Sequence, residues 1–182
     1  MSVSGLFVPG SIDDAPAASQ APLQGVLKQL GVVPNLFRMI ANSPAALKGY
    51  LELYGALSKG VLPASIREAI ALVVAELNQC DYCLSAHAFL ASNLVNIEDT
   101  EITANRKGLS RDKQTQAILQ FVISVVLERG KVGSDQLLKI REAGLNDAEI
   151  VEVIQHVSLN IFTNYLNNAG RAEVDFPLVH PV

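Results

Sequence analysis

Apolar residues recur three or four positions apart through most of the chain, which is the spacing of one face of an α-helix. The pattern is strongest over residues 63–78, where small apolar residues also occupy the side opposite the main stripe. The main stripe consists of Ile66, Ala69, Ile70, Val73, Val74 and Leu77. Two runs rich in β-branched residues, 72–77 and 121–126, lie within longer helical periods, so length favours helix over strand. A helix that is apolar on nearly every side should lie at the centre of the fold.

Glycines and short polar residues mark where the predicted helices begin and end. One helix should open at Ser110 and stop at Gly130, and a long final helix is expected over 146–170. No segment shows the sustained alternation of a β-strand. The sequence therefore predicts an all-α fold, with an irregular N-terminal arm over residues 1–20 and a single helical domain over residues 21–182.

The composition predicts contact with another subunit and argues against binding to nucleic acid. Hydrophobic residues make up 49% of the 182 residues and charged residues only 18%, whereas an average soluble protein has about 25% charged residues. The deficit of charge predicts that another subunit covers some apolar surface. The net charge of −4 leaves no basic stripe to neutralise phosphates, which argues against a nucleic-acid binder.

The predicted location of the chain decides how its cysteines are interpreted. No apolar run reaches the roughly 18 residues that a membrane span needs, and the first ten residues lack the basic and long apolar regions of an export signal. We therefore expect a cytoplasmic protein that does not enter the membrane. In a reducing compartment, a lone CxxC pair is more often catalytic or metal-binding than structural.

Both cysteines of the chain lie in the segment CDYCLSAH, with His87 four positions after Cys83. On a helix, Cys80, Cys83 and His87 fall on one side, and the i, i+4 spacing lets the imidazole reach the Cys83 sulfur. The preceding residues, Asn78 and Gln79, predict a break that would place Cys80 at a helix start. Unpaired backbone N–H groups there favour a thiolate. The segment is a candidate redox pair served by a base.

Two glutamates compete to complete a proton relay with these residues. Glu68 lies on the small-residue side of the preceding helix, twelve positions before Cys80. It approaches the thiols if the chain turns back near Asn78, and it could then pass protons. Glu76, one turn before Cys80, lies on a side edge of the same helix and is the alternative.

Two other interpretations of the motif stay open. Free cysteines and a lone histidine on an apolar face are often ordinary buried residues. Zinc could also bind to Cys80, Cys83 and His87, with His156 as a fourth ligand. Structural zinc usually occupies small loop-rich modules with two compact ligand pairs, whereas these donors lie on a helix. We therefore expect no metal and no cofactor.

The final helix carries a polar stripe on an otherwise apolar cylinder. The stripe consists of His156, Asn160, Thr163, Asn164 and Asn167. Buried amides need hydrogen-bond partners, so this stripe should face another helix, another subunit or the active-site cavity. A role for His156 or Asn160 in a substrate pocket is the functional alternative to hydrogen bonding across an oligomer interface.

The spacing of Glu68, eleven intervening residues and CxxCxxxH resembles that of the alkylhydroperoxidase AhpD-like group of the carboxymuconolactone decarboxylase superfamily. The flanking segments 34–50 and 144–177 are similar to the peroxidase-related branch of that superfamily. Together they extend the resemblance over most of the chain. It implies an all-helical fold and assembly into trimers or hexamers.

The resemblance also implies a thiol–disulfide peroxidase. Cys80 and Cys83 would be the redox dithiol, His87 the base and Glu68 the relay carboxylate. The best-known members carry a histidine immediately before the second cysteine, where this chain has Tyr82. A phenol with a pKa near 10 is a poor base at neutral pH, so Tyr82, like Glu76, His156 and Asn160, is expected only to support the site.

The predicted reaction is reduction of an organic hydroperoxide, with a lipoyl- or thioredoxin-type dithiol resetting the cysteines. The sequence leaves open which cysteine attacks first, because contact with His87 favours Cys83 whereas helix position and exposure favour Cys80. The alternative is a non-catalytic helical oligomer, or a redox sensor, with the same cysteines.

Overall fold

The computed structural model describes residues 5–182, which form nine α-helices and no strand. Residues 1–4 of the predicted N-terminal arm lie outside the described residues. The helices are α1 (Ala17–Leu30), α2 (Asn35–Ile40), α3 (Pro44–Leu57), α4 (Ala64–Leu77), α5 (Asp81–Asn93), α6 (Asp99–Arg106), α7 (Lys113–Leu127), α8 (Ser134–Glu142) and α9 (Asp147–Gly170). The all-α prediction is confirmed. Helix α1 begins at Ala17, inside the stretch expected to be irregular.

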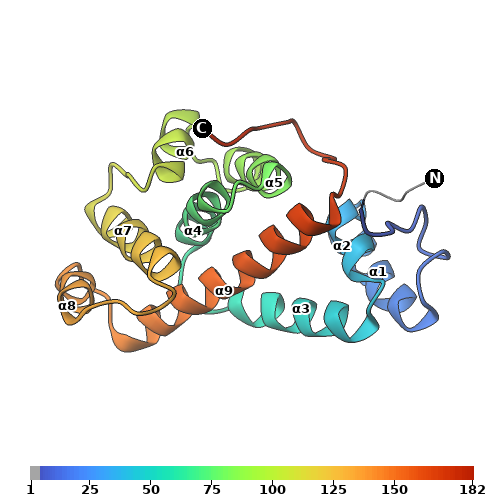
Figure 1. Cartoon of the computed structure of the whole chain (residues 1–182), viewed down its shortest axis with the longest axis horizontal. Coiled ribbons are helices and arrows are strands. Elements are labelled where there is room, and N and C mark those ends of the chain that lie inside the picture. Colours follow the sequence, from blue (N-terminus) through green and yellow to red (C-terminus); the bar gives the residue numbers. More distant parts are fainter. Residues whose placement is uncertain (1–4) are drawn as a thin grey trace.

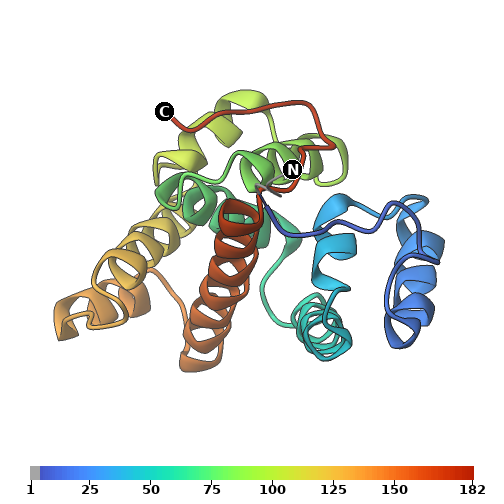
Figure 2. The ribbon, with the colours of Figure 1, turned by 45° about the vertical axis from the view of Figure 1, so that its right-hand side comes forward.

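Helix α4 occupies the centre, as its apolar circumference predicts. It packs against α5, α6, α7 and α9, and every residue from Ala69 to Glu76 is buried. Figure 1 shows α9 running diagonally through the molecule, with α3 on one side and α4 and α5 on the other. The main core joins α4, α7, α8 and α9, and a second cluster of buried side chains joins α1, α2 and α3. Figure 2 shows α1, α2 and α3 gathered on one side of α9.

The capping chemistry explains most of the helix boundaries. Helix α9 begins after Asn146, whose side chain accepts hydrogen bonds from the Ala148 and Glu149 backbone N–H groups. Helix α7 departs from the prediction, because its cap is Asp112, whose Oδ1 accepts from the Thr115 backbone N–H at 2.7 Å. Ser110 instead donates to Glu101 at 2.6 Å. The predicted cap was two residues early because both side chains are common caps and local sequence does not rank them.

The chain after α9 returns over the molecule as a C-terminal strap, residues 172–182. It contains no helix and crosses α5 to reach the neighbourhood of α6 (Figure 1). Its apolar side chains pack on the cluster that contains both cysteines. None of the helices in residues 5–182 combines the length and the apolar character that crossing a membrane would require.

Candidate functional site: a dithiol beside an imidazole–carboxylate pair

The two cysteines lie where α5 begins. Helix α4 ends at its C-cap Asn78, and Gln79 adopts a left-handed backbone conformation with φ of 53°. This reversal leaves Cys80 extended at the N-cap position, where its Sγ accepts a hydrogen bond from the Cys83 backbone N–H at 3.3 Å. The predicted break and the predicted helix start at Cys80 are confirmed. Cys83 therefore lies in the first helical turn, where the helix dipole favours an anion.

The surroundings of Cys83 favour its ionised form. The side-chain amide of Asn167, on α9, donates to the Cys83 Sγ at 3.3 Å. A hydrogen bond from the Cys80 thiol is the largest influence that lowers the pKa of Cys83 to about 7, against the effect of burial. The amides of Asn167 and Asn164 and the nearby His87 lower this pKa further.

Cys80 has the opposite role in this pair. Its thiol donates to the neighbouring sulfur, and this hydrogen bond, with burial, raises the pKa of Cys80 above its ordinary value. Both cysteines are free thiols, with exposed fractions of 0% for Cys80 and 3% for Cys83. Of the two sulfurs, Cys83 therefore has the lower pKa.

His87 and Glu68 form the second half of the site. Glu68, on α4, lies 2.8 Å from the Nδ1 of His87, on α5. Burial alone would lower the pKa of His87, but the Glu68 carboxylate and then the Cys83 sulfur raise it above its ordinary value. With Nδ1–H directed at Glu68, the neutral imidazole has its lone pair on Nε2. About a fifth of each side chain is exposed, 23% for His87 and 18% for Glu68, so protons can leave to solvent.

Glu76 is held elsewhere. Its Oε2 accepts from the Arg106 Nε at 2.7 Å, and its Oε1 accepts from the Val182 backbone N–H at 2.7 Å. Arg106 also donates to the His180 carbonyl at 2.6 Å. Of the two competing glutamates, Glu68 is therefore the one beside the imidazole, and Glu76 fastens the C-terminal strap to α4 and α6.

Tyr82 also faces the strap. Its hydroxyl accepts from the Leu36 backbone N–H at 3.1 Å, and its ring meets the Phe176 ring edge-on with centroids 5.8 Å apart. Burial is the main cause that raises the pKa of Tyr82, and the Asp175 side chain adds to it. Val179 and Ser85 exchange hydrogen bonds nearby, the shorter at 2.9 Å. These contacts place the strap over the cluster that contains the two cysteines.

The cysteine pair and the imidazole do not form a metal site. Within residues 5–182, no three His, Cys, Asp or Glu side chains are grouped so that they could hold a metal ion. His156, the fourth ligand in the zinc alternative, lies on α9 with its Nε2 buried and without a hydrogen-bond partner among the described residues. The zinc alternative therefore gains no support from the geometry.

The segment that carries the candidate site is similar to a known protein family. Residues 44–94 match the Carboxymuconolactone decarboxylase family, and this stretch contains α3, α4, α5 and all four residues of the dithiol and relay. The alkylhydroperoxidase AhpD core of a peroxidase-related protein from Ralstonia eutropha JMP134 superposes with a TM-score of 0.83. It is 20% identical, with 96% of this chain and 94% of that chain covered. The chain therefore has the AhpD-like fold, and its residues 44–94 resemble the Carboxymuconolactone decarboxylase family.

Two further solved structures share the whole fold. A peroxidase-related protein from Silicibacter sp. TM1040 has a TM-score of 0.80 at 23% identity, over 95% of this chain and 92% of that chain. The debrominase Bmp8, in complex with 2,3,4-tribromopyrrole, has a TM-score of 0.78 at 17% identity, over 96% and 94%. At such identities the likeness shows the fold alone. No curated protein matches this chain.

Within this AhpD-like fold, the polar stripe of α9 divides in two. Asn164 and Asn167 face Cys83, although only their membership of the stripe marked them in the sequence. Asn160 instead donates to the His156 carbonyl of its own helix at 2.8 Å. Burial, followed by Arg67, lowers the pKa of His156 to about 4, so this imidazole is neutral at pH 7.

The structure brings one further residue to the candidate site, and no sequence motif marks it. Tyr50, on α3, lies within electrostatic reach of both Cys83 and Glu68. It is one of four tyrosines and has no motif around it. Only the packing of α3 against α9 brings it to the dithiol.

Proposed function

We propose that the protein is a dithiol peroxidase that reduces an organic hydroperoxide at Cys83, with Cys80 as the second thiol. The observation that carries the proposal is the Cys83 sulfur at a helix N-terminus, bonded by the Asn167 amide at 3.3 Å and close to the His87–Glu68 pair. This surrounding lowers the pKa of Cys83 to about 7. A thiolate is the form of cysteine that attacks an O–O bond.

The first step uses the imidazole to move one proton. His87 Nε2 accepts the proton of Cys83, and the Glu68 carboxylate stabilises the resulting imidazolium through Nδ1–H. The thiolate attacks the terminal oxygen of the hydroperoxide, so an S–O bond forms and the O–O bond breaks. The alkoxide that leaves takes the proton from the imidazolium and departs as an alcohol. Cys83 becomes a sulfenic acid, oxidised by two electrons.

The second thiol then closes the cycle. Cys80 attacks the sulfenic sulfur of Cys83, a disulfide forms, and the hydroxyl leaves as water with the thiol proton. An external dithiol, of the lipoyl or thioredoxin type, reduces this disulfide by exchange and is itself oxidised to a disulfide. The assembly proposed for the chain is a homo-oligomer, a trimer or hexamer, which would cover exposed apolar residues of α9 such as Ile154 and Tyr165.

Thiol counting tests this proposal directly. Free thiols are titrated before and after one equivalent of cumene hydroperoxide, and again after dihydrolipoamide is added. A peroxidase loses two thiols per chain rapidly, regains both, and then consumes hydroperoxide catalytically. Cys83→Ser should abolish consumption, whereas Cys80→Ser should stop at the sulfenic acid, which dimedone traps. Oxidation without repeated turnover would overturn the enzyme and favour the redox sensor.

A further inference from the structure

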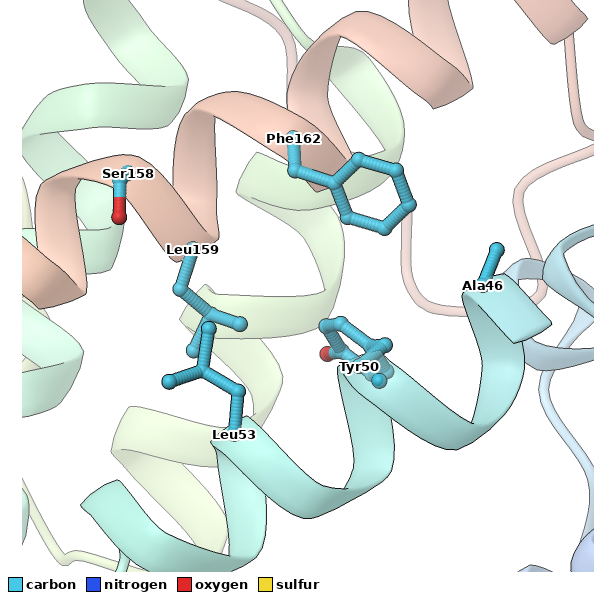
Figure 3. A pocket seen from close by; sticks show the side chains of 7 residues that line it. Ala46, Tyr50, Leu53, Ser158, Leu159 and Phe162 are labelled. Carbon is cyan, nitrogen blue, oxygen red and sulfur yellow. The ribbon is translucent and has the colours of Figure 1, made fainter.

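A pocket lies between α3 and α9, and its lining includes Tyr50, which is within electrostatic reach of Cys83. It has a volume of about 260 Å³. Its lining is almost entirely apolar and consists of Ala46, Gly49, Tyr50, Leu53, Ser158, Leu159 and Phe162. The Ser158 hydroxyl is already engaged, because it donates to the Gln155 carbonyl at 2.9 Å. Figure 3 shows Tyr50 and Phe162 facing each other across the pocket, with Leu53 and Leu159 at its other end.

Tyr50 joins this pocket to the dithiol. Its ring packs against Phe162 and Tyr54, with centroid distances of 6.0 and 6.1 Å. Within residues 5–182, no hydrogen bond is among the influences on the pKa of its hydroxyl, which makes this hydroxyl an uncommitted donor. Burial, Tyr54, Cys83 and then Glu68 raise the pKa of Tyr50, so the phenol keeps its proton. One side chain thus belongs both to the pocket wall and to the surroundings of the thiolate.

The C-terminal strap covers part of the dithiol. Phe176 and Val179 of the C-terminal strap pack on the cluster of Cys80, Tyr82 and Cys83. Core residues of α4 cover a further side, since Ala75 belongs to the same cluster and is fully buried. Neither the strap nor these α4 residues line the pocket between α3 and α9, which leaves the Tyr50 side as an approach for a hydroperoxide larger than hydrogen peroxide.

We propose that the pocket between α3 and α9 receives the alkyl or aryl group of the organic hydroperoxide, with its peroxide end directed past Tyr50 toward Cys83. This inference rests on the proposed peroxidase function and adds the place and chemistry of its substrate subsite. The apolar lining stabilises an uncharged hydrocarbon group by removing it from water. A charged group there would lose hydration without gaining a partner. The Tyr50 hydroxyl is available to donate to the oxygen that carries the organic group.

The small residues of α3 supply a way to fill the pocket without disturbing the dithiol. A Cβ built at Gly49 meets no atom within 4 Å, so a larger side chain can enter the pocket without strain. Gly55 lies on the same helix, and a Cβ there also meets nothing within 4 Å. Gly55 does not line the pocket. Gly49→Leu and Gly55→Leu are therefore a matched pair, since both replace a helical glycine with the same strong helix former.

The test compares cumene hydroperoxide with hydrogen peroxide as substrates of the two variants. Gly49→Leu should lower kcat/KM for cumene hydroperoxide about tenfold, through KM, because the hydrocarbon group loses its place. Its kcat/KM for hydrogen peroxide and the pH midpoint of thiol alkylation should not change. Gly55→Leu should resemble the wild type with both substrates. Equal loss with both substrates in Gly49→Leu would overturn the inference.

Binding without turnover separates this inference from the proposed function. In Cys83→Ser protein, 2-phenyl-2-propanol, the alcohol product of cumene hydroperoxide, should shift the NMR signals of ring protons in the pocket. Gly49→Leu should abolish the shift. If the wild type consumes peroxide but the alcohol does not bind, only the subsite is wrong. If Gly49→Leu changes the sedimentation coefficient instead, the pocket belongs to an interface between copies, and the inference also fails.

Discussion

Helix α4 carries two largely buried glutamates, and each is paired with a different basic side chain. Glu68 lies 2.8 Å from the His87 imidazole, and Glu76 lies 2.7 Å from the Arg106 guanidinium. Their side chains are 18% and 11% exposed. An imidazole gains and loses its proton near neutral pH, whereas a guanidinium keeps its proton. The partner, rather than the carboxylate, decides which of the two pairs can move protons.

The second difference lies in what else each carboxylate holds. Glu76 also accepts from the Val182 backbone N–H, and Arg106 donates to the His180 carbonyl, so this pair fastens the C-terminal strap. Glu68 makes no such contact with the strap and keeps its partly exposed position beside the dithiol. One pair holds the strap over the cysteines, and the other lies beside the dithiol.

The largest expected difference between the two glutamates is in activity. Glu68→Gln removes the charge that stabilises the His87 imidazolium, so kcat/KM for cumene hydroperoxide should fall by about 10²-fold or more. Glu76→Gln should keep kcat/KM within about threefold of the wild type, because it does not touch the reacting groups. Steady-state kinetics with a dithiol reductant measures both variants. Similar losses in the two variants would show that the two glutamates contribute equally to activity.

The effect on the free energy of unfolding should be larger for Glu76 than for Glu68, the reverse of the order for activity. Glu76→Gln leaves the mostly buried Arg106 without its carboxylate, which should lower the free energy of unfolding by about 3 kcal/mol. Glu68→Gln keeps a hydrogen-bond acceptor for a neutral His87, and should cost about 1 kcal/mol. Urea unfolding followed by circular dichroism measures both values. An equal cost would mean that the two pairs are equally structural.

The two glutamates should also differ in their effect on the pH dependence of thiol alkylation. In the wild type, the iodoacetamide rate should rise as pH increases through about 7, because Cys83 then loses its proton. Glu68→Gln removes the charge that keeps the pKa of His87 raised, so fewer imidazolium ions stabilise the thiolate and the midpoint should move up by about one unit. Asn167→Leu should move it in the same direction. Glu76→Gln should leave it in place.

The lowered pKa of Cys83 should also make the stability of the fold depend on pH. In the unfolded chain the Cys83 thiol has the ordinary cysteine pKa of 9.0, whereas in the folded protein its pKa is about 7. Between these values the unfolded state binds more protons, so the contribution of Cys83 to stability should be absent below pH 7 and should grow as pH rises toward 9. Cys83→Ser should remove this rise in urea unfolding at a series of pH values.

The smallest expected effect concerns access to the sulfurs. Glu76→Gln should loosen the C-terminal strap, so the alkylation rate at pH 9, where Cys83 is ionised in every variant, should rise about threefold. Glu68→Gln should not raise it. Phe176→Ala is a second route to the same result, because its ring packs edge-on against Tyr82. Unchanged alkylation in both strap variants would show that the strap does not limit entry.

Much of the dithiol half of the site could be predicted from the chain alone. The break at Asn78 and Gln79, the start of a helix at Cys80, and the shared face of Cys83 and His87 are all local, and local periodicity reports them. The central position of α4 followed from its apolar circumference, since such a helix has no face suited to water.

The partners of these residues depended on contacts between distant segments. Glu68 and Glu76 are both polar interruptions of one apolar helix, and only the packing of α5 and α6 against α4 assigns His87 to one and Arg106 to the other. Asn167 reaches Cys83 because α9 crosses α5, 84 positions later in the chain. Tyr50 and the strap are brought to the dithiol in the same way. Periodicity along a helix determines which residues share a face. The helix that packs against that face depends on burial over the whole molecule, so only the tertiary structure decided the partners of Glu68 and Glu76.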